Sequence, residues 1–162
     1  MNCPNCGAPM VYNQLQASYG CEYCRTVHVP APDDQGLRIS TETARHACPI
    51  CQLPLVWADL NGFPTETCPN CHGMLYVQDQ FGKTVKTLRA WARTPAVEPG
   101  PPALEELHRE VSCPSCRKPM STHLYGGPGN IVIDTCLRCG LVWLDHRELK
   151  RVLEAPGRDR RS

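Results

Sequence analysis

The sequence is poor in apolar side chains, in aromatic rings and in net charge. Phe, Trp and Tyr supply only ten of the 162 residues, and twelve of the residues in the 41% hydrophobic fraction are cysteines. This composition argues against one large hydrophobic core, so something other than burial must supply part of the folding free energy. The formal net charge of +1 gives no strongly basic footprint for nucleic acid over the chain as a whole.

Long hydrophobic runs are also absent. No segment approaches the roughly 18 apolar residues that span a bilayer, and the start of the chain, Met1 to Cys6, lacks the basic and apolar regions of a signal peptide. We therefore expect a cytoplasmic protein with no membrane partner. In a reducing compartment, abundant cysteine favours metal binding over a disulfide framework. Redox-active CxxC motifs are a weaker alternative, because no βαβ pattern surrounds them.

The cysteines have a regular spacing. All twelve fall into six CxxC pairs, which are Cys3/Cys6, Cys21/Cys24, Cys48/Cys51, Cys68/Cys71, Cys113/Cys116 and Cys136/Cys139. Taken two pairs at a time, they form three units with internal gaps of 14, 16 and 19 residues, which is close to the spacing of four-cysteine zinc sites. Interleaved pairings are possible, but neighbouring pairs close the shortest loops. The sequence thus predicts three Zn²⁺ ions, each bound by four cysteines.

A short motif marks the start of each unit. The pattern C-P-x-C-x-x-P-[ML] begins at Cys3, Cys48 and Cys113, so the chain holds three copies of one unit at unequal offsets. Modules of this size need metal to fold, because structural zinc contributes on the order of 10 to 16 kcal/mol of coupled binding and folding free energy. The predicted fold class is therefore small zinc-stabilised modules: three four-cysteine zinc ribbons, built from β-hairpins with zinc knuckles and flanked by short α-helices.

The segments between the knuckles read as hairpins. Residues 55–60 and 63–67 flank Asn61-Gly62, a strong type I′ turn signal, and residues 121–125 and 131–134 flank a glycine-rich turn. A hairpin within residues 10–19 has a weaker signal. We expect the apolar hairpin residues to cover the knuckles, with an exposed docking patch as the alternative. These residues include Val56, Trp57, Ile131 and Ile133.

Helices and linkers complete the predicted organisation. Residues 81–93 read as a basic helix, residues 103–111 as a short acidic helix, and Asp145 as the N-cap of a C-terminal helix with Glu148 in a capping box. The predicted boundaries are ribbon 1 at 1–30, a linker at 31–47, ribbon 2 with the basic helix at 48–93, a Pro-rich linker and acidic helix at 94–112, ribbon 3 with its helix at 113–155, and a disordered tail at 156–162.

The third unit resembles a known family. The run from Cys136 to Leu149, CLRCGLVWLDHREL, is similar to the CGGxWLDxxEL ending of the bacterial transcription-factor zinc-finger family, whose zinc ribbon is like that of transcription factor IIB. Leu141 replaces the second glycine, which matters if the backbone there needs positive φ. The resemblance implies a zinc ribbon with Cys113, Cys116, Cys136 and Cys139 as ligands. It is clearest over 113–149, looser over 48–81 and weak over 3–30.

These features favour a non-catalytic role. Catalytic zinc keeps an open coordination position, whereas four cysteines close each site, and we expect neither an enzyme nor a small-molecule substrate. His28 and His72 lie near knuckles, but with four cysteines available we expect neither to replace a ligand. The leading hypothesis is an adaptor whose ribbons bind a protein partner. A thiol redox or zinc-release switch is a lesser alternative.

A second hypothesis is nucleic-acid binding with a role in transcription. Each loaded site adds two negative charges, so three loaded sites lower the formal net charge from +1 to about −5, and any phosphate contact must be local. A solvated helix face is the plainer interpretation of the basic stripe. The candidate nucleic-acid-binding residues are Lys83, Lys86, Arg89, Arg93, Arg158, Arg160 and Arg161.

Overall fold

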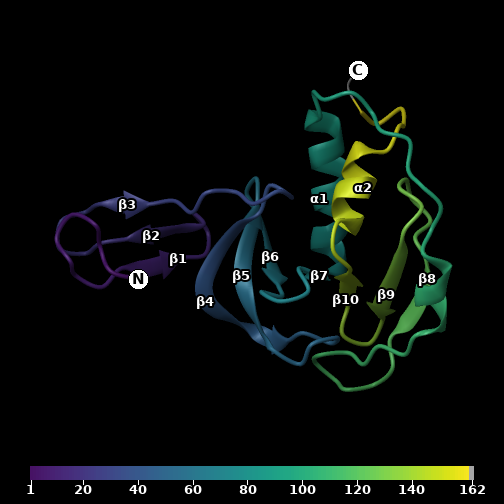
Figure 1. Ribbon diagram of the computed structural model, residues 1–162, viewed down its shortest axis with the longest axis horizontal. Coiled ribbons are helices and arrows are strands. Elements are labelled where there is room, and N and C mark those ends of the chain that lie inside the picture. Colours follow the sequence, from purple (N-terminus) through teal and green to yellow (C-terminus); the bar gives the residue numbers. More distant parts are fainter. Residues whose placement is uncertain (161–162) are drawn as a thin grey trace.

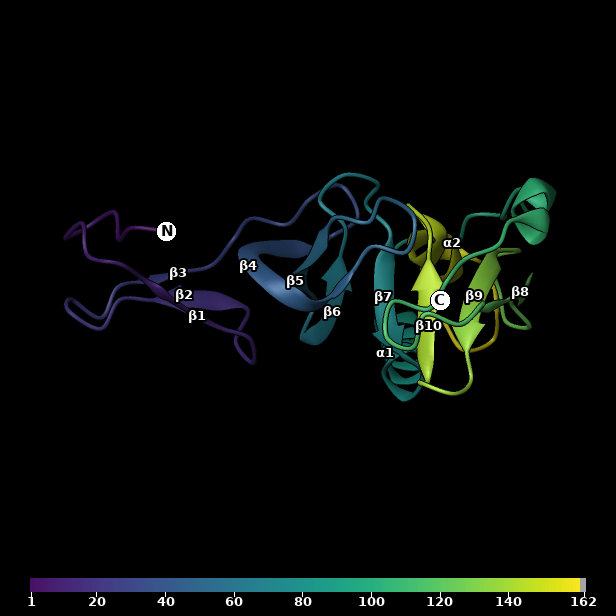
Figure 2. The same ribbon diagram turned by 90° about the horizontal axis from the view of Figure 1, so that it is seen from below.

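The computed structural model describes residues 1–160, and its strands form one small and one large β-sheet (Figure 1). The small sheet belongs to ribbon 1 and has the order β1-β2-β3, with strands at Val11–Asn13, Ser18–Gly20 and Val27–His28. Pairing of β1 with β2 confirms the hairpin expected near the N-terminus. Ribbon 1 lies at one end of the elongated molecule, and ribbon 3 lies at the other (Figure 2).

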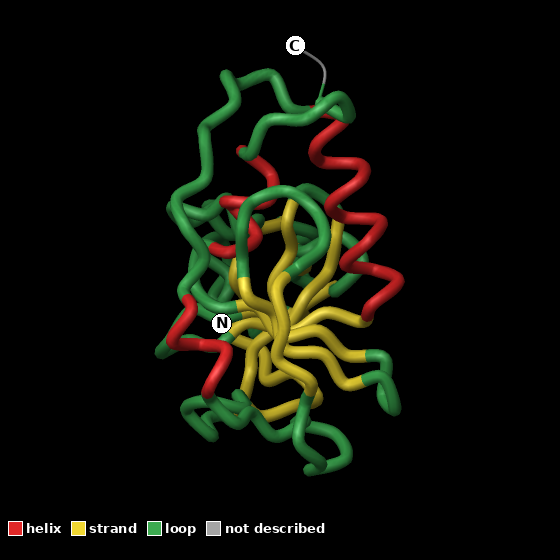
Figure 3. Tube along the Cα trace, turned by 90° about the vertical axis from the view of Figure 1, so that its right-hand side faces the viewer, coloured by secondary structure: helices red, strands yellow, loops and turns green. Residues whose placement is uncertain are grey.

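The large sheet has seven antiparallel strands in the order β4-β5-β6-β7-β10-β9-β8. Its strands fan out in a marked twist (Figure 3). Both predicted hairpins of ribbons 2 and 3 are confirmed, and Asn61 and Gly62 have the two positive φ angles, 52° and 91°, that a type I′ turn requires. The strands are β4 (Arg38–Ala47), β5 (Pro54–Leu60), β6 (Phe63–Thr67), β7 (Met74–Val77), β8 (Ser121–Leu124), β9 (Val132–Cys136) and β10 (Leu141–Leu144).

Ribbons 2 and 3 share this sheet. Strands β7 and β10 follow the second knuckle of their ribbons and pair antiparallel, with Leu75 opposite Trp143. Outward from this pair, β6 and β5 on one side match β9 and β8 on the other. The two ribbons are therefore related by an approximate two-fold axis, and they form one unit. The sequence left open whether the ribbons pack together, and the structure shows that each ribbon covers the open edge of the other's inner strand.

Two helices cover one face of the large sheet. Helix α1 (Gln78–Trp91) follows β7, helix α2 (Glu148–Glu154) follows β10, and the helices pack against each other (Figure 1). Beneath them, the side chains of Tyr76, Ile133 and Val142 form a buried core. The opposite face carries a second core in which Trp143 and Leu75 pack with cysteines of both ribbons. The knuckles of ribbons 2 and 3 are thus tied to a common core.

Two predicted connections differ from the structure. Residues 31–47 were expected to be a linker, but β4 occupies Arg38–Ala47 and pairs with β5. It is an edge strand with irregular register and mostly polar side chains that are partly or fully exposed, so it lacks the apolar alternation that identifies a strand in the sequence. The acidic segment forms a short 3₁₀ helix, η1 (Leu104–His108), rather than the expected helix over 103–111.

The C-terminal end also differs. The cap position of α2 is Arg147, with φ of 66°, and not Asp145 as predicted. The Asp145 carboxylate accepts hydrogen bonds from Trp143 and Arg109 instead, although its amide donates to Glu148 at 2.7 Å as a capping box requires. Residues 156–160 were expected to be disordered, but here Asp159 is bonded to Arg89. Within the described residues, no helix is both long and apolar enough to span a bilayer.

Candidate metal centres

The twelve cysteines form three compact clusters. In each, four sulfurs lie within 4.8 Å of one another, and each cluster combines the two CxxC pairs of one ribbon. The sequential pairing expected from the sequence is therefore the one that the structure shows. The clusters are Cys3, Cys6, Cys21 and Cys24; Cys48, Cys51, Cys68 and Cys71; and Cys113, Cys116, Cys136 and Cys139.

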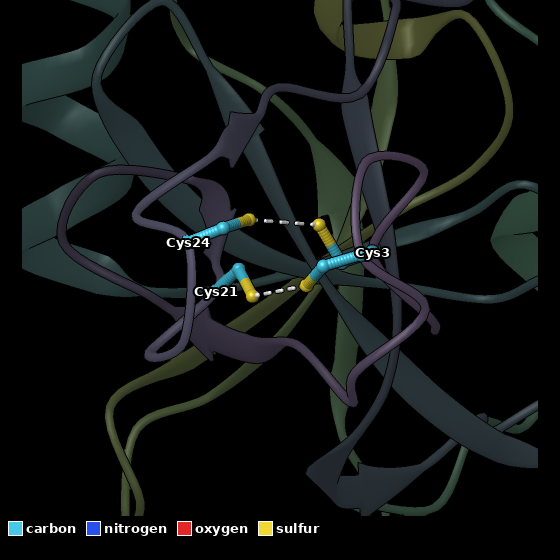
Figure 4. A group of neighbouring side chains, drawn as sticks. Cys3, Cys21 and Cys24 are labelled. Carbon is cyan, nitrogen blue, oxygen red and sulfur yellow. Dashed lines mark hydrogen bonds between the residues drawn. The ribbon is translucent and has the colours of Figure 1, made fainter.

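Sulfur-to-sulfur distances match a shared metal ion. The Sγ atoms of Cys3 and Cys24 are 3.5 Å apart (Figure 4), and those of Cys116 and Cys136 in ribbon 3 are 3.7 Å apart. A tetrahedral ion with metal–sulfur bonds of about 2.3 Å places its sulfurs roughly 3.8 Å apart. A disulfide would require about 2.05 Å. The clusters therefore fit four-coordinate metal, and all twelve thiols are free.

A common backbone turn shapes all six knuckles. The residue after the second cysteine has a left-handed backbone in every one, with φ between 58° and 75°. In five knuckles its amide also donates to the carbonyl of the first cysteine, at 2.8 to 3.0 Å. The turn aims both sulfurs of a pair at one point. The six residues are Gly7, Arg25, Gln52, His72, Arg117 and Gly140.

This turn explains why Leu141 is tolerated. The positive φ, 63°, belongs to Gly140, and Leu141 is the first residue of β10, with its side chain buried. The family's second glycine is thus not needed for the turn here. Four of the six knuckles have the same backbone conformation without glycine, which costs about 1 kcal/mol of folding free energy each. The residues are Arg25, Gln52, His72 and Arg117.

Each pair presents one buried and one more accessible sulfur. The first cysteine is buried in all six pairs, whereas the second is partly or fully exposed. The buried sulfurs of ribbons 2 and 3 belong to the core behind the large sheet. Each metal position is therefore fixed to the core on one side and open to solvent on the other, where an oxidant or chelator gains access first.

Local groups tune the thiols in opposite directions. The Thr26 hydroxyl, 3.1 Å from the Cys24 sulfur, lowers the pKa of Cys24 to about 5. The Asn70 amide donates to Cys51 at 3.2 Å and lowers the pKa of that thiol. Burial raises the pKa of Cys48 to about 11. A bound dication would supply the positive charge that stabilises the buried thiolates.

Neither candidate histidine joins a cluster. His28 lies on β3, with its ring 6.4 Å from that of Tyr19. The ring of His72 lies 5.4 Å from that of His146, near the start of α2. Over residues 1–160, no four-cysteine cluster includes a histidine.

The candidate basic residues differ in their exposure to solvent. Arg89 is fully buried and donates to the carbonyls of Val152 and Ala155, so it cannot contact nucleic acid. The sequence placed it on an exposed stripe because the packing of α2 against that face of α1 was not foreseen. Lys83 and Lys86 are exposed beside Tyr125. Three other candidates line one hollow, namely Arg93, Arg158 and Arg160, whereas Arg161 lies outside the described residues.

Sequence reasoning missed a buried ion-pair network. Arg109, just after η1, donates to Asp134 at 2.6 Å and to Asp145 at 2.5 Å. Asp134 is completely buried on β9, and Asp145 also accepts from the Trp143 indole. These bonds fix the segment before ribbon 3 against its sheet. A lone arginine in the segment predicted to be an acidic helix carries no signal of such a role in the sequence.

Comparison with known proteins agrees with the geometry of the third ribbon. Residues 112–155 match the family model described as transcription factor zinc-finger. The third ribbon is thus similar to zinc ribbons of the transcription factor IIB type. This confirms the resemblance seen at residues 113–149, while the looser resemblance of ribbons 1 and 2 stays a prediction. No curated protein and no solved structure matches the chain.

Proposed function

We propose that this protein is a non-catalytic adaptor that holds three Zn²⁺ ions, one in each ribbon, and binds a protein partner through ribbon 1. The donor set supports zinc, because four thiolates in tetrahedral reach favour Zn²⁺ over harder ions. Four protein ligands leave no open position for substrate or activated water. The role of the metal is then to hold the knuckles together.

The observation that supports ribbon 1 is the density of its exposed apolar side chains, since the larger ribbons 2 and 3 expose only scattered ones such as Leu53 and Leu137. Ribbons 2 and 3 bury their hairpins in a common sheet, where Ile131 and Ile133 are almost inaccessible. Ribbon 1 keeps a core of its own around Tyr19 and leaves apolar side chains in solvent. The exposed set comprises Met1, Val11, Leu15, Tyr23, Val27 and Val29. Exposed apolar groups gathered on one small module are typical of an interaction site.

One face of ribbon 1 is already occupied. Tyr19 in β2 packs on Tyr12 at 5.0 Å, and its hydroxyl accepts from the Thr41 amide of β4 at 2.7 Å. The other face carries Val11 and Val27, which flank Gly20 in directly paired positions. No atom lies within 4 Å of where a Gly20 side chain would begin, and a hollow of about 250 Å³ lies there. This face, the Val11–Gly20–Val27 face, is the proposed docking surface.

Its chemistry favours an apolar side chain of a protein partner. The hollow combines two valines with polar groups such as Ser18 and Asn13 and one carboxylate, Glu22, and its lining contains no cation. A phosphate backbone would find no basic partner on this face. An extended partner segment could place one apolar side chain over Gly20 between the two valines.

Filling the hollow tests the proposal without removing a native side chain. Gly20→Thr places a β-branched residue in a strand, where it favours folding, yet obstructs the docking surface. Gly82→Ala, at an exposed and open position of α1, is the matched control. The zinc-loaded chain is used to capture partners from its native lysate, with half of each sample treated with nuclease.

We expect the unmodified chain to capture one protein partner in stoichiometric amount, with or without nuclease treatment. Gly82→Ala should capture the same amount of this partner, whereas Gly20→Thr should capture at least tenfold less. Val11→Thr combined with Val27→Thr should cause a similar loss. Leu124→Thr, at an exposed apolar residue of β8, should not. Equal capture by Gly20→Thr and the unmodified chain would remove ribbon 1 as the docking module, and absence of any stoichiometric protein would remove the adaptor role.

A further inference from the structure

A basic hollow lies between the segment that follows α1 and the segment that follows α2. Its volume is about 740 Å³. Arg93, Arg158 and Arg160 line it, together with Pro95 and Pro156, and no acidic residue does. The three arginines come from positions up to 67 residues apart in the chain, so only the fold brings them together.

Hydrogen bonds between the two segments hold the walls of the hollow in place. Arg160 donates to the carbonyls of Leu153 and Thr94, the latter at 2.7 Å, and so ties the two segments together. The amide of Val97 donates to the carbonyl of Glu154 at 2.9 Å, a second tie between them. Proline at both walls restricts the backbone further. The arginines are therefore presented by a held surface rather than by free chain ends.

The carboxylate closest in sequence to these arginines is already paired. Asp159 lies between Arg158 and Arg160 in sequence, but it accepts two hydrogen bonds from the buried Arg89 guanidinium, at 2.5 and 2.7 Å. That contact holds the pKa of Asp159 below its usual range, so the carboxylate stays ionised and bound to Arg89. Within residues 1–160, no carboxylate pairs with Arg93, Arg158 or Arg160. Over the described residues, the hollow thus concentrates positive charge without a paired carboxylate.

We propose that this hollow binds the phosphate groups of a polyanion, presented by a nucleic-acid backbone or by a free polyphosphate. Guanidinium groups bind phosphate oxygens with paired, charge-assisted hydrogen bonds, and a polyanion would relieve the repulsion among three arginines. The volume admits more than one phosphate group. This site is separate from the docking surface of ribbon 1, so the two proposals succeed or fail independently.

The test compares two probes on the full zinc-loaded chain. Inorganic tripolyphosphate binding is measured by calorimetry, and a fluorescent single-stranded oligonucleotide by anisotropy, between 50 and 300 mM salt. The variant is Arg93→Gln with Arg158→Gln, which leaves the anchored Arg160 in place. The control is Lys118→Gln with Arg138→Gln, an equal charge change at exposed residues on the knuckles of ribbon 3.

We expect at least one probe to bind, the arginine variant to weaken that binding tenfold or more, and the control to change it less than twofold. For the oligonucleotide, loss of two phosphate contacts should flatten the slope of log affinity against log salt by about 1.4. Binding of tripolyphosphate identifies a free polyphosphate as a sufficient ligand, and binding of the oligonucleotide alone identifies the nucleic-acid backbone. Binding of neither probe at 50 mM salt, or equal losses in variant and control, overturns the proposal.

Discussion

Gly73 of ribbon 2 packs closely against ribbon 3, and Gly73→Ala should separate the two ribbons. A Cβ atom at this residue would lie 2.2 Å from one carbon of the Trp143 ring and 2.8 Å from a second. The carbonyl oxygen of Leu144 would be 3.0 Å away. These contacts join the second knuckle of ribbon 2 to the central strand of ribbon 3, next to the β7–β10 pairing.

The expected loss of folding free energy is large because the groups around Gly73 have little room to move. Trp143 has no exposed surface, its indole donates to Asp145 at 3.1 Å, and it sits in the core that holds the cysteines of both ribbons. The strand carbonyl of Leu144 is fixed by the sheet. Overpacking of a well-packed core costs about 1–3 kcal/mol, and we expect Gly73→Ala at or above the upper end of that range. The carbonyl of Gly73 also accepts the Cys68 amide at 3.0 Å, so the displacement should reach a metal ligand.

Equilibrium unfolding of the zinc-loaded chain in denaturant measures this cost. Hydrogen exchange of the β7 and β10 amides should increase selectively in Gly73→Ala. Gly82→Ala is the opposite control, because the same chemical change on an open face of α1 should stabilise the chain by about 0.5–1 kcal/mol. An unchanged unfolding free energy and unchanged exchange in Gly73→Ala would refute the close packing of the two ribbons.

Three further predictions concern the knuckles and a buried acid. Arg117→Gly should stabilise ribbon 3 by about 1 kcal/mol by thermal unfolding because φ at this residue is 63°, whereas Arg117→Ala, which keeps the strain, should bring no gain. Burial and the nearby Asp145 charge raise the pKa of Glu148 to about 8, so the folded state holds this proton more tightly than the unfolded chain does. The free energy of unfolding should therefore fall by up to about 1.4 kcal/mol per pH unit as the pH rises from about 4.5 toward 8. Denaturant titrations at several pH values measure this slope, and Glu148→Gln should flatten it. An equal slope in both proteins would count against the buried carboxyl. Cys6→Ser should unfold ribbon 1 alone in amide NMR spectra, whereas Cys71→Ser should perturb ribbons 2 and 3 together, and a change confined to ribbon 2 would contradict their shared core.

The metal clusters could be predicted from sequence because their information is local. A CxxC pair and its turn are complete within six residues, and the Asn61-Gly62 turn fixes its hairpin in the same way. Zinc-ribbon spacing then limits which pairs combine. For this reason the ligand clusters and hairpins agreed with expectation, including the weakly signalled hairpin of ribbon 1.

The arrangement of the ribbons depended on contacts distant in sequence. The strands β7 and β10 are short apolar runs, and nothing local indicates that Leu75 meets Trp143 across some 70 residues. The burial of Arg89 follows from that pairing, since it brings α2 onto the face of α1 that looked solvated. β4 was missed for the opposite reason, because an edge strand with exposed polar residues resembles a linker.

Native mass spectrometry of the full chain, combined with elemental analysis, tests the central claim most directly. Three closed four-cysteine sites predict three zinc ions per chain, bound to twelve reduced cysteines. Stepwise chelation should then release the ion of ribbon 1 separately from the two ions of the shared sheet. Fewer than three zinc ions in the fully folded chain, or a mass lowered by disulfide formation at any cluster, would contradict the account.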